Sequence, residues 1–174
     1  MVSQTRWFER RFNFDFPVGL FPAIAERLLG TAARLEEMTR GRSKSLLIHQ
    51  LEGKWSVQQH AGHLVDLEEL HNGRIDDFHA GLERLRAADL KNTRTELADH
   101  NTSAIADILA RFRGDRQRFV ARLSECDEER LSRSAIHPRL NLPMRLVDMA
   151  YFVAEHDDHH LASIRRIISI SAQR

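Results

Sequence analysis

Apolar residues recur at steps of three or four along most of the chain, which is the period of an amphipathic α-helix. Polar or proline-containing segments interrupt this pattern at only a few places. The pattern therefore predicts four long helices, which begin near Pro17, Ser56, Ile105 and Pro143. The chain has only eight glycines and four prolines, which argues against a fold made of many short strands.

The start of the second helix carries the clearest boundary signal. Ser56 and Gln59 have the spacing of a capping box, in which the serine hydroxyl accepts a hydrogen bond from a first-turn amide and the glutamine reaches back. The apolar stripe that follows is expected to end near Gly81. The polar segment 86–102 then leads to the third helix, and the segment 137–143, which contains two prolines, is expected to be a loop.

Four amphipathic helices of this length predict an all-α fold, an antiparallel four-helix bundle formed by a single domain over residues 1–174. The connection between the second and third helices is long enough to cross the bundle. The order of the helices around the bundle is left open by the sequence.

The composition of the chain limits the kinds of molecule that the protein is expected to bind. The formal charge is +1, from 26 basic and 25 acidic side chains, so neither nucleic acid nor a membrane is expected as a partner. No apolar run reaches the roughly 18 residues needed to cross a bilayer, and the amino terminus lacks the apolar core of a secretory signal. Because Cys126 is the single cysteine, no intrachain disulfide can form, and a reducing, cytoplasmic location is expected.

Histidine is concentrated on the last predicted helix. His156 and His160 lie one turn apart on its apolar stripe, whereas His159 falls on the flank. The two rings could be core histidines bonded to their neighbours, since each unpaired buried polar group would cost roughly 1–3 kcal/mol. A divalent metal would satisfy both rings at once, and two histidines four residues apart on one helix face are a known ligand arrangement. On spacing alone the two interpretations are equally good.

A catalytic metal commonly takes three protein ligands and keeps one position open. The second predicted helix offers His60 and His63 for the third position. Helical periodicity favours His60, because His63 lies at the edge of the apolar stripe. The choice between them needs information beyond periodicity.

The second helix, read from Trp55, resembles a motif of the DinB/YfiT-like family of metalloenzymes. That family has a Trp-Ser start, a Glu or Gln four residues after the Trp, and a ligand histidine eight residues after it. The matching positions in this chain are Ser56, Gln59 and His63. Segment 137–167 resembles the closing loop and last helix of the family, in which two ligands lie four residues apart.

The resemblance implies a four-helix bundle that holds one metal through His63, His156 and His160. The resemblance therefore selects His63 in place of His60 as the third ligand. His60 then becomes either a candidate to orient a ligand ring or an ordinary core residue. Asp157 is a second candidate to orient a ligand ring, and its alternative is an exposed or helix-pairing acid. No catalytic side chain is identified.

Imidazole ligands suit zinc, nickel, iron and manganese, of which zinc or nickel is expected first. The wider family includes thiol S-transferases and a thiol-dependent isomerase. The resemblance therefore implies a metal that holds a low-molecular-weight thiol as its thiolate for transfer to a small electrophile. Two alternatives stay open, a metal-dependent hydrolase and a non-catalytic protein of the stress response that binds a metal or a small molecule.

Three further expectations concern the rest of the chain. Asp66 is expected to line a solvated face, and Arg74 is expected in a surface ion pair. A homodimer is expected, mainly because members of the resembled family often pair through the faces of their bundles. The apolar residues of segments 6–14 and 165–171 add slight support to that expectation.

Overall fold

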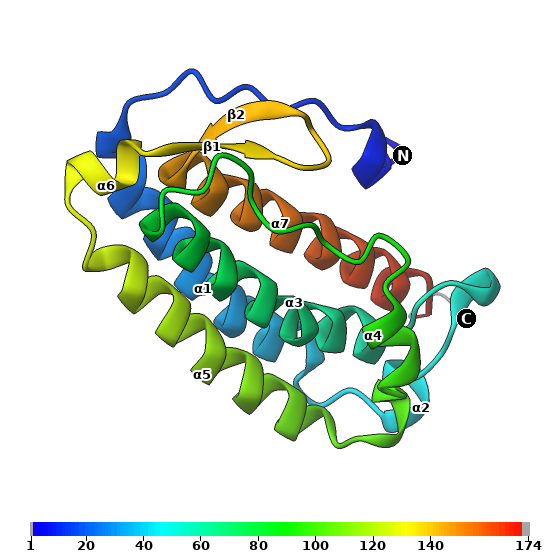
Figure 1. The fold of residues 1–174 in the computed structure, drawn as a ribbon. Helices are drawn as coiled ribbons and strands as arrows, with labels where there is room; N and C mark the ends of the chain where they lie inside the picture. The colour runs from blue at the N-terminus through cyan, green and yellow to red at the C-terminus, as the bar shows by residue number, and fades with distance from the viewer. Residues whose placement is uncertain (1, 172–174) are drawn as a thin grey trace.

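The computed structural model describes residues 2–171 and is mostly helical (Figure 1). Four long helices form the predicted bundle: α1 (Phe21–Thr39), α3 (Val57–His79), α5 (Ile105–Ser124) and α7 (Leu146–Ser171). Three short helices lie in the connections: α2 (Lys44–Leu47), α4 (Thr93–Leu97) and α6 (Glu128–Ser132). Single 3-10 turns occur at Trp7–Glu9, Val18–Leu20, Leu51–Gly53 and His100–Thr102. No helix in the described part of the chain is long and apolar enough to cross a membrane.

Each long helix packs against two others. Helix α1 contacts both α5 and α7, and α3 contacts the same two helices from the opposite side of the bundle. The expectation of an antiparallel bundle was wrong in one respect. Helices α3 and α5 run in the same direction, and so do α1 and α7 (Figure 1). The reason is the long connection 80–104, which returns along the length of the bundle before α5 begins (Figure 1).

The helix starts follow local chemistry. Ser56 caps α3 as predicted, because its hydroxyl accepts a hydrogen bond from the Gln59 amide at 3.1 Å and its own amide donates to Gln59 Oε1 at 3.0 Å. Helix α1 begins at Phe21, slightly later than predicted, because a 3-10 turn at Val18–Leu20 follows Pro17.

The prediction of a loop over residues 137–143 was correct only for residues 138–141, which form the turn of a hairpin. Strand β1 (Ser134–His137) pairs with β2 (Leu142–Arg145) in an antiparallel hairpin, and α7 begins only at Leu146. Pro143 therefore lies in a strand instead of starting a helix, and β2 is an edge strand, where proline is tolerated.

The long connection is fastened to this hairpin by main-chain hydrogen bonds. The amide of Ile136 donates to the Glu83 carbonyl at 2.8 Å, and the amide of Leu85 donates to the Ile136 carbonyl at 3.1 Å. Hairpin and connection thus form one cover beside α3 and α7 (Figure 1).

The apolar interior is divided into two clusters that lie at opposite ends of the four long helices. On every long helix, a buried polar residue separates the part that enters one cluster from the part that enters the other. These residues include Thr31, Glu68, Arg116 and Asp157, and they form a polar layer across the middle of the bundle. The clustered histidines of α3 and α7 lie beside this layer.

Part of the apolar surface that suggested a dimer is covered within the chain. The ring of Trp7 lies 5.0 Å from that of Phe152 on α7, and the ring of Phe12 lies 4.9 Å from the same side chain. The N-terminal segment therefore already has an internal partner, and the homodimer stays a prediction.

Candidate metal centre

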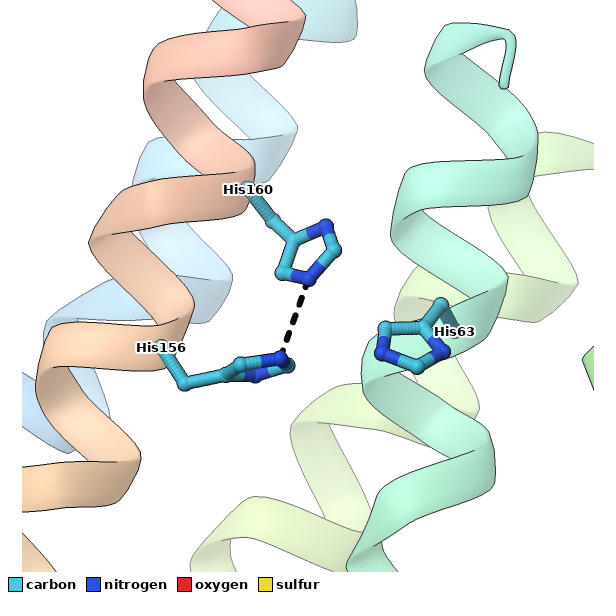
Figure 2. A group of neighbouring side chains, drawn as sticks. All are labelled: His63, His156 and His160. Carbon is cyan, nitrogen blue, oxygen red and sulfur yellow. Dashed lines mark hydrogen bonds between the residues drawn. The ribbon is translucent and has the colours of Figure 1, made fainter. Parts of the chain in front are cut away.

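His63 on α3 and His156 and His160 on α7 bring their rings together in the space between the two helices (Figure 2). One ring nitrogen of each lies within 4.8 Å of the others, and the Nε2 atoms of His156 and His160 are 3.1 Å apart. All three side chains are buried. The structure therefore brings together the three histidines that the resemblance singled out.

The chemistry of this set fits a divalent metal. Burial lowers the pKa of His63 to about 3 and the pKa values of His156 and His160 well below their ordinary value. All three rings are therefore neutral at physiological pH, which is the form that binds metal. A tetrahedral ion bound at about 2.0–2.1 Å needs ligand nitrogens roughly 3.4 Å apart, so small ring movements would complete the set.

A chain of hydrogen bonds fixes the ring of His63. Its Nδ1 lies 2.9 Å from the hydroxyl of Thr95, and that hydroxyl donates to Asp66 Oδ2 at 2.9 Å. Because the Thr95 proton goes to Asp66, His63 donates through Nδ1–H and keeps the lone pair of Nε2 free for a metal. Such partners behind a ligand set its tautomer and orientation.

His100 completes this chain from the end of the long connection. Its Nε2 lies 2.8 Å from Asp66 Oδ2. Burial would raise the pKa of Asp66, but the hydrogen bonds from His100 and Thr95 and the charge of Arg94 lower it overall. Gly62 makes room for this ring, because a Cβ atom at that position would lie 2.2 Å from His100 Cγ.

His60 contacts the opposite edge of the cluster. Its Nδ1 lies 2.8 Å from Nδ1 of His160, while His160 turns Nε2 toward His156. Burial, with His159 adding to it, lowers the pKa of His60 to about 4. His60 is thus placed to orient the His160 ring, and it stands outside the set of three converging nitrogens.

Asp157 is a helix-pairing acid, one of the alternatives given for it, and does not orient a ligand ring among the described residues. Its carboxylate accepts hydrogen bonds from Thr31 on α1, at 2.8 Å, and from Arg116 on α5. It contacts no histidine ring by a hydrogen bond among the described residues, and it is fully buried instead of exposed. Asp157 therefore joins three helices across the polar layer instead of orienting a ligand ring.

A cavity of about 260 Å³ opens beside the three histidines. Its walls come from α3, α7, the N-terminal segment, the long connection and the hairpin loop, and they include Trp7, Trp55, Leu67, Leu70 and Phe152. The centroid of the Trp55 ring lies 4.7 Å from that of His63. The cavity gives a small, mostly apolar molecule access to the histidine cluster.

Two expectations for α3 were wrong. Asp66, expected on a solvated face, is buried under the long connection, and Arg74, expected in a surface ion pair, is buried as well. The spacing of Asp66 from His63, one helical turn, is a signal that could have linked them. The partners Thr95 and His100 carried no such signal, because only the folded connection brings them to α3.

Comparison with known proteins agrees with this description. The family model for the DinB superfamily matches residues 27–164. Among solved structures, the chain is similar to YfiT from Bacillus subtilis, described as a probable metal-dependent hydrolase with an unusual four-helix bundle topology. The TM-score is 0.78 at 22% sequence identity, over 94% of each chain. At that identity the likeness concerns the fold. No curated protein matches the sequence.

Proposed function

The chain belongs to the DinB superfamily, and from that premise we propose that it is a metal-dependent enzyme that hydrolyses a small molecule in the cavity beside His63, His156 and His160. The observation that carries the proposal is the convergence of three buried, neutral imidazoles at the wall of this cavity. A structural zinc usually has four protein ligands. Three converge among the described residues, which favours a site with a position left for substrate or water.

A divalent cation supplies Lewis acidity, which lowers the pKa of a coordinated water or polarises a carbonyl group. The residues of the chain provide the rest. Thr95 and Asp66 hold the His63 ring, and His60 holds the ring of His160. Trp55 and two leucines of α3, Leu67 and Leu70, give the cavity apolar walls. Zinc or nickel is proposed first, with iron and manganese as further candidates, because all four accept imidazole.

Transfer of a small thiol to an electrophile is the second candidate. Three neutral ligands leave the charge of a divalent ion uncompensated, and this favours an anionic further ligand such as a thiolate. Hydrolysis stands first because the structural neighbour is described as a probable hydrolase, whereas no comparison supports thiol transfer.

The experiment starts from protein purified without a histidine tag and analysed for bound metals. A panel of small esters and amides is then tested with and without low-molecular-weight thiols. We expect hydrolysis without thiol, loss of hydrolysis and of metal in His156→Ala, and neither loss in His49→Ala, which changes an exposed histidine. Turnover that requires a thiol would instead establish the transferase, and stoichiometric metal without turnover in either assay would indicate a binding protein.

A further inference from the structure

One wall of the cavity gathers hydrogen-bond donors that the metal centre does not use. They are Arg74 from α3, His137 at the end of β1 and Arg139 in the loop between the strands. All three side chains line the same cavity, and the charges of Arg74 and Arg139 add to the effect of burial, which lowers the pKa of His137 to about 3.

Arg74 forms no salt bridge with a carboxylate within the described part of the chain. Its side chain is 3% exposed, and Nε and Nη2 both donate to the main-chain carbonyl of Arg86 at 3.2 Å. Nη1 has no acceptor within residues 2–171, and the Arg74 side chain lines the cavity. Burial lowers the pKa of Arg74 to about 10, with Asp77 opposing the effect and the charges of Arg139 and Arg86 adding to it.

His137 presents a second unused donor. The side chain is 2% exposed, and its Nδ1 accepts a hydrogen bond from the Leu140 amide at 3.1 Å. The ring hydrogen is therefore on Nε2. That atom is buried and has no partner in the described part of the chain. Buried polar atoms are nearly always paired, so an unpaired donor on a side chain that lines the cavity indicates a missing acceptor.

Arg139 presents a third unused donor. Its Nη2 is buried and likewise lacks a partner among the described residues. Its guanidinium is held by aromatic faces, 5.6 Å from the ring of Trp7 and 5.5 Å from that of Phe152. Burial alone lowers the pKa of Arg139, with no carboxylate opposing it. Packing on these rings fixes the side chain in place without satisfying its donors.

We propose that Arg74, His137 and Arg139 form a subsite for the carboxylate of a small organic acid, whose apolar body fills the cavity toward the histidine cluster. Three free donors suit the two oxygens of a carboxylate, and an anion would relieve the repulsion between the guanidinium groups of Arg74 and Arg139. The apolar walls suit a hydrocarbon body, and the volume of about 260 Å³ limits its size. This inference rests on the proposed function in that it names the substrate class of the same cavity.

The test measures binding without metal, so that its outcome is independent of hydrolysis. Chelator-treated protein at pH 8 is titrated by calorimetry with hexanoate, with hexanamide and with hexyl phosphate. We expect hexanoate to bind at least about tenfold more tightly than the neutral amide, because charge-assisted hydrogen bonds are lost in the amide. Equal affinity for hexanoate and hexanamide, or no measurable hexanoate binding, would overturn the subsite. Tighter binding of hexyl phosphate would overturn its assignment to a carboxylate.

Two variants locate the subsite. Arg139→Gln and His137→Phe should each weaken hexanoate binding roughly tenfold and leave hexanamide binding unchanged. Arg118→Gln, an exposed arginine on α5, is the matched control and should change neither. Unchanged hexanoate affinity in Arg139→Gln would refute the proposal. Arg139 lies in a surface loop, so this variant carries the test even if His137→Phe fails to fold.

Discussion

Arg116 is the centre of the polar layer, and its replacement by methionine gives the sharpest test of how the bundle is held together. Its side chain is 1% exposed. Nε and Nη2 donate to Glu68 Oε1 at 2.9 and 2.7 Å, and both terminal nitrogens donate to the carboxylate of Asp157. Burial alone would lower the pKa of Arg116, but the charges and hydrogen bonds of Asp157 and Glu68 raise it overall.

Methionine fills much of the same volume but leaves two buried carboxylates without their counter-ion. Removing one partner from a buried ionic group typically costs about 3–5 kcal/mol. Proteins of this length lose about 2–4 °C in Tm per kcal/mol, so Arg116→Met should lower Tm by about 6–20 °C. Adding Glu68→Gln and Asp157→Asn to this variant should recover part of the loss, because the uncompensated charges are then gone.

The assay is urea unfolding of chelator-treated protein, followed by circular dichroism, so that bound metal does not add to the measured stability. Arg118→Met, two residues along α5, changes an exposed arginine paired with Asp115 and should cost less than about 1 kcal/mol. A loss below about 1 kcal/mol in Arg116→Met, or no recovery in the triple variant, would refute the assignment of this cost to buried charge.

Four further outcomes are expected. His156→Ala should abolish stoichiometric metal binding in elemental analysis, whereas His159→Ala should retain it, because His159 lies outside the converging set. Gly62→Ala should displace His100 from Asp66 and weaken metal affinity roughly tenfold or more, as measured by competition with a chromogenic chelator. His137 stays neutral in the folded protein, with its pKa lowered to about 3, but takes up a proton in the unfolded chain below about pH 6.5. Unfolding free energy of the metal-free protein should therefore fall as pH falls from about 6.5 toward 3, and His137→Phe should reduce that slope by up to about 1.4 kcal/mol per pH unit in urea titrations. Sedimentation at micromolar concentration should show a homodimer, and a monomer would contradict that prediction.

The helices could be predicted because their signals are local. The capping box of α3 and the apolar stripes depend on residues within one or two turns, so the four long helices were predicted close to their observed places. The hairpin was missed because a proline such as Pro143 is typical of the first turn of a helix. Pro143 becomes part of a strand only through pairing with β1. The parallel direction of α3 and α5 likewise depends on the path of residues 80–104, which has no periodic signal.

In the candidate site, too, the features with local sequence signals were predicted and those that depend on distant segments were not. His156 and His160 follow from their spacing on one helix, but periodicity preferred His60 to His63. The edge of the stripe on α3 is not solvent-facing in the fold, because the connection covers it and supplies Thr95 to the ring of His63. Arg74 was misplaced for the same reason, since its burial depends on the cover formed by the connection and the hairpin.

The polar layer has a consequence for the histidine cluster beside it. A slip of any long helix by one turn would carry a polar residue of the layer into an apolar cluster, and on α3, α5 and α7 that residue is charged, so the layer fixes the level at which α3 faces α7. The three histidines are thereby held opposite one another by interactions that need no ion. We therefore expect the metal-free protein to fold, unlike a zinc finger, which folds only around its ion. For a site of this kind we expect the choice of metal to depend on which metals are available as well as on the three imidazole ligands.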